Sequence, residues 1–490
     1  MAEPAFDPVA LFARIGRAPR RVTSDSRDVR AGDAFAAWPG SRVDGRAYIP
    51  DAIARGAGTV LWESQGFRWS ADWTVPNAGV DRLAAKLGYI ADVVYGQPSR
   101  DLWMVAVTGT NGKTTTSQWI AQALDAAGRR CGVIGTLGIG LAGALAPSAN
   151  TTPDAAVFHE TLAAFRAAGA KAVSMEVSSI GLDQGRVNGA TFDVAVFTNL
   201  TRDHLDYHGT MAAYGDAKAR LFSWPGLACS VINADDPYGQ RLIDEVRGRG
   251  GRAMSYGLAG ADVEATGVAM GPRGLSLGVS TPWGRGEVDT AVVGAFNVSN
   301  LLATLGALLA SDVALDPALD ALSRLAPPPG RMERHGGDDR PLVVVDYAHT
   351  PDALEKVLAA LRPAVARGRE LVCVFGCGGD RDPGKRPAMG RVAATLADRV
   401  IVTSDNPRGE DPAAIAGAVA KGIVETGQRH WLVELDRAAA IAAAVRAAKP
   451  GDVVLVAGKG HESYQETAGE RRPFSDARAA EDALAAWGGA

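Results

Sequence analysis

The 490-residue chain is poor in cysteine, carries no strong excess of either charge and contains no long apolar run. Its four cysteines, Cys131, Cys229, Cys373 and Cys377, have neither metal-site nor disulfide-framework spacing, so we expect buried thiols in a reducing compartment. The formal net charge of −4 provides no field that would attract nucleic acid. No apolar run is long enough to cross a membrane, and MAEPAFDPVA lacks the features of a signal peptide. We therefore expect a cytoplasmic, multi-domain enzyme that acts on small-molecule substrates, is monomeric and does not insert into a membrane.

The length predicts about three domains, all of the α/β class. Residues 1–98 are typical of a small module with a helix at 47–55 and a strand at 59–62. Residues 99–328 alternate strands with helices, which predicts a central, P-loop-type, mostly parallel sheet domain, with a small antiparallel excursion at 253–294. A proline-rich linker at 326–330 leads into residues 329–490, which predict a Rossmann-like domain. The expected strands are 102–107, 132–134, 172–177, 193–198, 230–233, 342–345, 371–375, 400–403, 431–434 and 453–456, and the expected helices include 114–127, 154–168, 211–223 and 297–309.

The stretch 102–116, LWMVAVTGTNGKTTT, predicts a phosphate-binding loop. An apolar strand leads into a glycine-containing turn, and a helix follows, so backbone N–H groups and the helix dipole favour an anion there. Lys113 adds a positive charge for the outer phosphates, and the Thr114 hydroxyl is a suitable Mg²⁺ ligand. The loop is a variant, because Val107 occupies the position where the usual pattern has its first glycine.

Polar residues follow the other central strands, at the sheet edge where open α/β sheets bind ligands. The segment 150–153, NTTP, either caps a helix or holds a phosphate. Glu176 ends an apolar strand, a position that suits Mg²⁺ beside a nucleotide, and Ser178, Gln184 and Arg186 follow it. Segment 198–209 contains Asp203, His204, Asp206 and His208, and the spacing does not decide which has a catalytic or metal role. Lys218 is by default a solvated surface charge.

Four polar loops follow strands of the last domain, at 346–351, 376–387, 404–412 and 458–462. Their arginines and acids are suited to a zwitterionic ligand, because arginine pairs with carboxylate and an acid pairs with ammonium. In the first domain, residues 24–27 and 41–43 form polar loops. From chemistry alone the loop at 24–27 is more typical of a capped turn than of a phosphate site.

Eleven motifs occur in this order between residues 108 and 462: TGTNGKTTT, NTTP, MEVSS, TNLTRDHLDYHG, YGDAKARLF, FNVSNLLA, PGRME, DYAHTPDALE, FGCGGDRDPGKRP, SDNPRGEDP and GKGHE. Together they resemble the Mur ligase family of cell-wall peptide synthetases, and within it the members that add meso-diaminopimelate to UDP-N-acetylmuramoyl-L-alanyl-D-glutamate. The resemblance implies an ATP-dependent amide ligase of peptidoglycan precursor synthesis. In such an enzyme ATP and Mg²⁺ convert a carboxylate to an acyl phosphate, which the amine then attacks.

The resemblance also assigns residues of the nucleotide site. Lys113, Lys218 and His204 are the implied catalytic residues, and Lys218 matches the family's carbamylated lysine, formed with CO₂. The implied metal ligands are Thr114 or Thr115, Glu176, His204 and the Lys218 carbamate. The implied ATP-binding residues are Gly109, Thr110, Asn111, Gly112, Lys113, Thr114, Thr115, Asn297, Arg331 and Asp346, the last three across a domain junction, which implies domain closure.

Two further sets of residues follow from the same resemblance. The UDP-sugar peptide is assigned to Ser26, Ser41, Arg42, Val43, Asn150, Thr151, Thr152, Ser178, Gln184 and Arg186. The incoming amino acid is assigned to Arg381, Asp405, Asn406, Pro407, Arg408, Gly458 and Glu462. Arg408 favours meso-diaminopimelate over lysine, because lysine lacks the extra carboxylate and leaves the guanidinium unpaired. Ile180 departs from the histidine that the family often has after its paired serines.

Two other functions compete with this interpretation. One is another Mur-type or folylpolyglutamate-type ligase, which shares the phosphate loop. The other is a nucleotide-switched binding protein that hydrolyses ATP slowly and ligates nothing. The first alternative should lack the DNPR and GKGHE motifs as they stand here. A ligase differs from the second in releasing phosphate only when both the peptide and the amino acid are present.

Overall fold

The computed structural model describes residues 6–40, 43–148, 150–271 and 274–488. The chain divides into two compact units. The first comprises Met1–Glu264, Ser280–Gly284 and Asn300–Ala321, and the second comprises Ala265–Val279, Arg285–Ser299 and Leu322–Ala490. The predicted boundaries at 98/99 and 328/329 stay predictions, because this division places the first predicted domain and most of the second in one unit. Across the described ranges, we find no helix that combines the length and the apolarity needed to cross a membrane.

The N-terminal part of the first unit is a parallel sheet with the strand order β1-β2-β3-β4. The strands are β1 (Val22–Thr23), β2 (Ala34–Ala37), β3 (Thr59–Glu63) and β4 (Asn77–Val80), and the helices are α1 (Pro8–Ile15), α2 (Ile49–Ala54) and α3 (Leu83–Val94). The helix predicted at 47–55 begins as a 3₁₀ turn, Gly45–Tyr48, and becomes α-helical only at Ile49. Pro50 accounts for this, because a proline fits the first turn of an α-helix but not its interior.

The central part of the first unit is a sheet with the order β12-β11-β10-β5-β9-β6-β7-β8. From β12 to β6 all neighbours are parallel, whereas β7 and β8 add antiparallel pairs at one edge. Apolar side chains of α5 and α9 pack against the sheet beside Met104 and Ala106 of β5. The elements are β5 (Trp103–Thr108), α4 (Lys113–Ala126), β6 (Cys131–Gly135), β7 (Gly138–Leu141), β8 (Ala144–Ala146), α5 (Ala155–Ala167), β9 (Ala172–Glu176), α6 (Ser179–Asp183), β10 (Val194–Phe197), α7 (Leu205–His208), α8 (Met211–Ala219), β11 (Cys229–Asn233), α9 (Pro237–Gly248), β12 (Ala253–Gly257), α10 (Phe296–Ala310) and α11 (Leu315–Ser323).

The parallel sheet extends further than the sequence predicted. Residues 253–257 belong to the expected antiparallel excursion, yet they form β12, which pairs in parallel with β11. The helix α9 makes the crossover between these two strands, which parallel neighbours require. The next strands, β13 (Val263–Gly271), β14 (Gly274–Thr281) and β15 (Gly284–Thr290), follow one another in the sheet order, and β13 begins parallel to β12.

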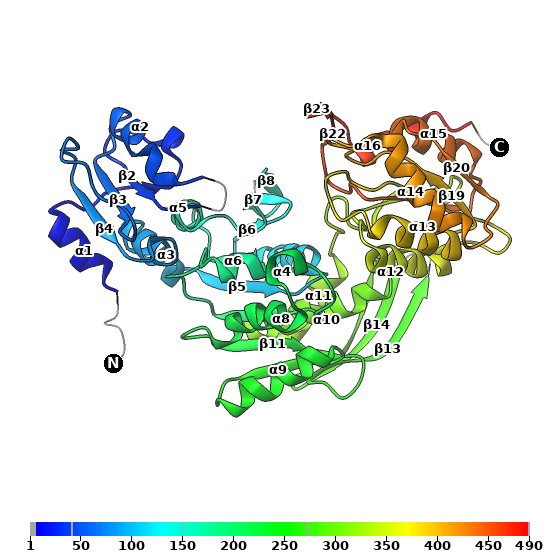
Figure 1. The fold of residues 1–490 in the computed structure, drawn as a ribbon. Coiled ribbons are helices and arrows are strands. Elements are labelled where there is room, and N and C mark those ends of the chain that lie inside the picture. The colour runs from blue at the N-terminus through cyan, green and yellow to red at the C-terminus, as the bar shows by residue number, and fades with distance from the viewer. Residues whose placement is uncertain (1–5, 41–42, 149, 272–273, 489–490) are drawn as a thin grey trace. The chain divides into compact units, whose positions relative to one another are not determined.

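The second unit contains a sheet with the order β16-β17-β21-β18-β19-β20, in which only the edge pair β16–β17 is antiparallel. Helices α12, α13 and α14 pack on one face, and α15 and α16 pack on the other (Figure 1). The elements are β16 (Glu333–Gly336), β17 (Leu342–Asp346), α12 (Pro351–Leu361), β18 (Leu371–Phe375), α13 (Lys385–Leu396), β19 (Arg399–Val402), α14 (Pro412–Val424), β20 (Trp431–Val433), α15 (Arg437–Ala447), β21 (Val453–Ala457), the hairpin β22 (Tyr464–Thr467) and β23 (Glu470–Pro473), and α16 (Asp476–Ala485). The predicted Rossmann-like arrangement of this region is confirmed.

The cysteines behave as the sequence predicted. Cys131, Cys229, Cys373 and Cys377 are buried and carry free thiols. Burial raises the pKa of the Cys131 and Cys377 thiols to about 12, so both stay protonated at neutral pH. They act as small apolar core residues.

Candidate active site

The turn between β5 and α4 has the backbone geometry of a phosphate cradle. Gly109 has φ 143° and Gly112, which caps α4, has φ 84°. A Cβ at Gly109 would lie 1.9 Å from the Thr198 hydroxyl, so only glycine fits this position. The Lys113 ammonium donates to the carbonyl oxygens of Gly109 at 2.9 Å and Thr110 at 2.7 Å, which holds its charge over the turn.

Residues after β10 fix the outer side of this turn. The Thr198 hydroxyl donates to the Asn111 carbonyl at 2.6 Å, and the Asn199 side-chain oxygen accepts from the Asn111 N–H at 3.0 Å. The Tyr214 hydroxyl lies 3.2 Å from that of Thr110. The sequence placed TNLTRDHLDYHG at a strand end but did not single out Asn199 or Tyr214, because neither residue type marks a phosphate loop.

Glu176 is buried at the end of β9, where its carboxylate faces the first turn of α4. One carboxylate oxygen accepts from the Thr114 hydroxyl at 2.9 Å and from the Thr136 hydroxyl at 3.1 Å. The other accepts from the Thr136 N–H at 2.7 Å. The structure thus brings two predicted metal ligands, Thr114 and Glu176, into direct contact.

The default expectation that Lys218, on α8, is a solvated surface charge is wrong. Its side chain is only 1% exposed, its ammonium nitrogen donates to the Gly109 carbonyl at 2.8 Å, and it lies 4.4 Å from the centre of the Tyr214 ring. Burial, reinforced by the charge of Lys113, lowers the pKa of Lys218 well below its ordinary value, while Asp203 opposes the shift. The amine therefore lies beside the phosphate loop, in surroundings that favour its neutral form.

His204 and His208 occupy different surroundings at the two ends of α7. His204 has φ 51° and a half-exposed side chain, whose ring nitrogen lies 3.5 Å from the Asp203 carboxylate. His208 lies 3.0 Å from the Ser179 hydroxyl. Within the described part of the chain, no group of three or more histidine, cysteine or acidic side chains is arranged to hold a metal, so the metal role of His204 stays a prediction.

Several residues predicted to bind the UDP-sugar peptide lie together beside Glu176. The Thr152 hydroxyl donates to the Glu176 carbonyl at 3.0 Å and lies 3.2 Å from the Ser178 hydroxyl. The Arg186 guanidinium donates to the Thr152 carbonyl at 2.7 Å and to the Gln184 side chain. Burial lowers the pKa of Arg186, although Asp154 and Tyr207 oppose the shift.

The remaining residues of that predicted set are more scattered. Ser26 begins a 3₁₀ turn capped by Asp25 and is half-buried, and Val43 is 57% exposed. Asn150 is exposed, and its carbonyl accepts from Ser148 at 2.9 Å. Ser41 and Arg42 lie outside the described residues. The binding roles of all five positions stay predictions.

In the second unit, the predicted amino-acid residues Asn406 and Glu462 form one network. The Asn406 amide donates to the Glu462 carboxylate at 2.7 Å. Lys459, which is completely buried, donates to the Asn406 side-chain oxygen at 3.0 Å and to Glu462 at 2.8 Å. The sequence included Lys459 in the GKGHE motif but gave it no role, since a lysine in a loop is normally a surface residue.

Arg408 is held by the β22–β23 hairpin. Its φ is 51°, and its N–H and C=O pair with Glu466 and Ala468. Its guanidinium donates to the Gly379 carbonyl at 2.8 Å, at the start of the loop that carries the exposed Arg381. Pro407 lies between Asn406 and Arg408, and its carbonyl accepts from Glu410.

Asp405 and Gly458 meet at the base of the same network. Gly458 has φ 116°, and a Cβ there would lie 2.6 Å from an Asp405 carboxylate oxygen. Burial raises the pKa of Asp405, although Arg437 and Lys459 oppose the shift. Six of the seven predicted amino-acid-binding residues, Asp405 to Arg408, Gly458 and Glu462, therefore lie together through direct contacts or as chain neighbours.

Asp346, Arg331 and Asn297 also belong to the second unit. The Asp346 carboxylate accepts from the backbone N–H groups of Met332 at 2.9 Å and Ala348 at 2.8 Å. Burial raises the pKa of Asp346, and the charge of Arg331 opposes the shift. The Arg331 guanidinium lies 4.7 Å from the centre of the Tyr347 ring, and the Asn297 amide donates to the Val293 carbonyl at 2.7 Å. Their roles in ATP binding stay predictions.

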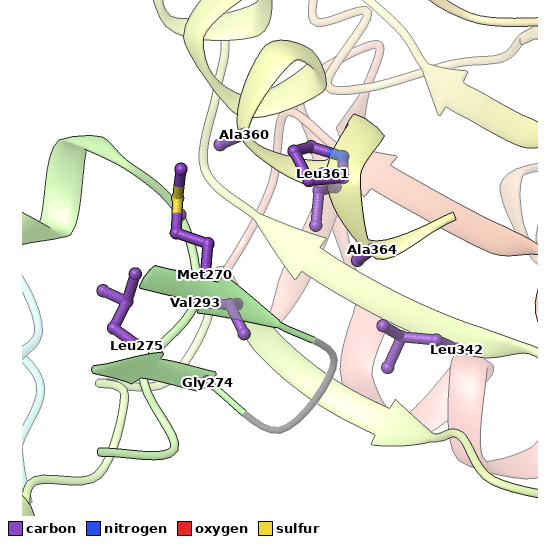
Figure 2. A pocket seen from close by; sticks show the side chains of 10 residues that line it. Met270, Gly274, Leu275, Val293, Leu342, Ala360, Leu361 and Ala364 are labelled. Carbon is purple, nitrogen blue, oxygen red and sulfur yellow. The ribbon is translucent and has the colours of Figure 1, made fainter. Parts of the chain in front are cut away.

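One pocket of the second unit has an apolar lining, unlike the polar networks described above. It is lined by residues of β13, β14, β17 and α12, among them Met270, Leu275, Leu342 and Leu361, and Figure 2 shows these side chains around it. Its lining offers no titratable or nucleophilic side chain. The chemistry of the candidate site therefore lies in the polar strand-end loops and not in this pocket.

Comparisons with known proteins cover almost the whole chain. Residues 20–95, 107–308 and 330–460 match the families described as "Mur ligase family, catalytic domain", "Mur ligase middle domain" and "Mur ligase, glutamate ligase domain". The UDP-N-acetylmuramoyl-L-alanyl-D-glutamate–2,6-diaminopimelate ligase of Chromobacterium violaceum is 52% identical, over 99% of this chain and 98% of the relative. The ligase of the same name from Pseudomonas aeruginosa is 53% identical, over 96% and 95%. A solved structure of a ligase of that name aligns with a TM-score of 0.71 at 38% identity, over 96% of this chain and 95% of the other.

Proposed function

This chain belongs to the Mur ligase family, and we propose that it joins meso-diaminopimelate to UDP-N-acetylmuramoyl-L-alanyl-D-glutamate, using ATP, in cytoplasmic peptidoglycan precursor synthesis. The observation that carries the substrate assignment is the hydrogen-bonded network of Asn406, Lys459 and Glu462, with Arg408 two positions after Asn406 in the same loop. It places an arginine and a carboxylate in one polar loop cluster, as a zwitterionic amino acid with an extra carboxylate requires. The names of relatives at about half identity point to the same substrate.

The first chemical step is transfer of the terminal phosphoryl group of ATP to the glutamate carboxylate of the peptide. A carboxylate is a poor electrophile, and the resulting acyl phosphate is a good one. The transfer brings two anions together, so positive charge and N–H donors must surround them. Lys113 and the N-terminus of α4 supply both, because the Lys113 ammonium already lies over the turn, where phosphate oxygens can replace the carbonyl oxygens of Gly109 and Thr110 as its acceptors.

Thr114 and Glu176 fit a magnesium ion that accompanies ATP. Both are buried oxygen donors, and they are 2.9 Å apart. A hydroxyl and a carboxylate suit Mg²⁺, which binds one or two protein oxygens and completes its shell with water and phosphate. The ion, when bound, neutralises charge on the transferring phosphoryl group. Of the chain's own groups, Thr136 holds the Glu176 carboxylate toward α4.

Lys218 fits a carbamate. A neutral amine adds CO₂ and releases a proton, and burial favours the neutral form of the Lys218 amine. The product keeps one N–H, which can still donate to the Gly109 carbonyl. The new anion would lie close to the charge of Lys113, and this attraction stabilises it.

The second step joins the amine to the activated carbon. The amine nitrogen forms the C–N bond, the bond from that carbon to the phosphate oxygen breaks, and inorganic phosphate leaves. Arg408 binds the distal carboxylate of meso-diaminopimelate, and Glu462 binds its ammonium group. Thr151, Thr152, Ser178 and Arg186 hold the UDP-linked peptide in the first unit.

The direct test is the product. The purified protein is incubated with ATP, Mg²⁺, UDP-N-acetylmuramoyl-L-alanyl-D-glutamate and meso-diaminopimelate, and the nucleotide products are resolved by mass spectrometry. The proposal predicts one new UDP-linked tripeptide, together with ADP and phosphate. ADP without any new UDP-linked species would instead support a nucleotide-switched binding protein.

A further inference from the structure

Glu176 is oriented by a residue that belongs to no predicted set. Thr136 follows β6 and donates to both oxygens of the Glu176 carboxylate, from its N–H at 2.7 Å and from its hydroxyl at 3.1 Å. Such two-point contact from one residue fixes both the position and the rotation of a carboxylate. Thr114, on the phosphate-loop helix, donates to the same oxygen that accepts from the Thr136 hydroxyl.

Gly135, the residue before Thr136, leaves room for this contact because it has no side chain. A Cβ on Gly135 would lie 2.4 Å from a Glu176 carboxylate oxygen. Any other residue at this position would push the carboxylate away from the Thr136 N–H. The glycine at position 135 thus allows the Glu176 carboxylate to approach the end of β6 closely.

Thr136 also contacts the segment predicted to bind the UDP-linked peptide. Its hydroxyl lies 3.0 Å from the hydroxyl of Thr151. The neighbouring Thr152 donates to the Glu176 carbonyl at 3.0 Å, so both threonines of the segment are tied to the end of β9. A continuous hydrogen-bonded path therefore runs from Thr151 through Thr136 and Glu176 to Thr114.

The chemistry of hydroxyl groups gives this path a direction. A threonine hydroxyl has one proton, and that of Thr136 is donated to Glu176. The Thr136 oxygen therefore accepts the proton of Thr151 across their 3.0 Å contact. A ligand oxygen that takes the Thr151 proton removes this donor, which weakens the bond from Thr136 to Glu176, since neighbouring hydrogen bonds polarise one another.

We propose that Thr136 is a positioning residue that couples the peptide-substrate site to the magnesium–nucleotide site. This inference rests on the proposed function, because it takes Thr151 as a contact of the UDP-linked peptide and Glu176 as a magnesium ligand. Occupation of one site changes the affinity of the other through the Thr151–Thr136–Glu176 path. By thermodynamic reciprocity, each ligand changes the binding of the other by the same factor.

The test measures binding and requires no turnover. Isothermal titration calorimetry gives the Kd of a magnesium-bound, non-hydrolysable ATP analogue, with and without saturating UDP-N-acetylmuramoyl-L-alanyl-D-glutamate. For the unmodified protein we expect the ratio of the two Kd values to differ from one by about 5-fold or more. In Thr136→Val, which keeps the shape of the side chain but removes the hydroxyl, the ratio should fall to about one. Thr136→Ser restores a hydroxyl and should restore the ratio.

Further variants separate this path from a general loss of structure. Thr151→Val should reduce the ratio as Thr136→Val does, and the double variant should reduce it no further. Thr59→Val removes another buried hydroxyl, on β3, and should leave the ratio unchanged. A ratio near one in the unmodified protein, or an unchanged ratio in Thr136→Val, would overturn the proposal. Failure of the unmodified protein to bind the UDP-linked peptide at all would instead overturn the proposed function.

Discussion

Lys218 illustrates how strongly surroundings can change the chemistry of a residue. From its type alone a lysine on a helix is a solvated charge, whereas here it is buried against Tyr214 and the Gly109 carbonyl. Only the resemblance to a family predicted a special role, because burial of a lysine depends on contacts far apart in the chain. The contact with the Gly109 carbonyl spans 109 positions.

The carbamate proposal predicts a specific pattern of loss and rescue. Lys218→Ala removes the anion beside the phosphate loop, so ligase activity should fall by about 100-fold or more. Added short-chain carboxylates, such as formate or acetate, should restore part of the activity by occupying the space of the carbamate. The measurement is the rate of UDP-tripeptide formation with and without the added acid.

Two results would contradict a carbamate at this position. One is full activity of Lys218→Ala, and the other is a loss that no carboxylate relieves while the variant remains folded. Lys171→Ala, at the start of β9, is a control, because its side chain is exposed. It should keep its activity and show no response to the added acid.

Arg408 gives a second prediction at the same scale. Arg408→Ala removes the partner of the distal carboxylate of meso-diaminopimelate, which should cost about 1–3 kcal/mol, or a roughly 5- to 150-fold lower kcat/KM for that substrate. The KM for ATP should change far less, because Arg408 is not among the residues predicted to bind ATP. Steady-state kinetics with each substrate varied in turn measures both effects.

The control for Arg408 is Arg429→Ala, which removes an exposed arginine of the same unit and should change neither constant. Equal losses for ATP and for meso-diaminopimelate in Arg408→Ala would remove Arg408 from the amino-acid pocket.

At the scale of elements, the sequence predicted most strands and helices and placed the functional loops at the ends of strands. The phosphate loop and Glu176 could be found because a buried apolar run followed by polar residues is a local signal. The partners Thr136, Asn199 and Lys459 could not be found in this way. Thr136 meets Glu176 across 40 positions and Lys459 meets Asn406 across 53, and the pairing of β-strands decides such contacts.

Helices α3 and α5, which lie side by side in Figure 1, bury an acid against a histidine. A nitrogen of His159 lies 3.5 Å from the Asp92 carboxylate, and the other nitrogen lies 2.9 Å from the Asn188 carbonyl. Burial raises the pKa of Asp92 to about 6 and lowers the pKa of His159 to about 4. At neutral pH the histidine is therefore uncharged.

The two shifts act on stability in opposite directions. Between about pH 4 and 6, folded Asp92 holds a proton that the unfolded chain has lost, so this group lowers stability as the pH rises. In the same range, unfolded His159 holds a proton that the folded chain lacks, so this group raises stability as the pH rises. The two contributions to the pH dependence of the free energy of unfolding therefore nearly cancel.

Asp92→Asn should expose the histidine contribution. Relative to the unmodified protein, the free energy of unfolding of this variant should rise by up to about 1.4 kcal/mol per pH unit between pH 4 and 6. Urea unfolding followed by tryptophan fluorescence at pH 4, 5 and 6 measures the difference. Asp51→Asn changes an exposed acid of α2 and should give no such trend. A constant difference between Asp92→Asn and the unmodified protein would contradict the buried pair.

At the scale of the whole molecule, the residues proposed to carry out the ligase reaction belong to two compact units. The first contains the phosphate loop, Glu176, Lys218 and the threonines proposed to bind the peptide. The second contains the proposed amino-acid network. The sequence predicted three α/β regions and the family from ordered motifs. It could not predict that contacts would join the first region and most of the second into one unit, because contacts such as that of Asp92 with His159 connect distant segments.

The most direct measurement is phosphate release from ATP and Mg²⁺ under substrate omission. The protein is assayed with UDP-N-acetylmuramoyl-L-alanyl-D-glutamate alone, with the amino acid alone and with both, and meso-diaminopimelate is compared with L-lysine. We predict sustained release only with the UDP-linked peptide and meso-diaminopimelate together. Equal release with L-lysine would contradict the role given to Arg408, and release independent of both substrates would contradict the ligase itself.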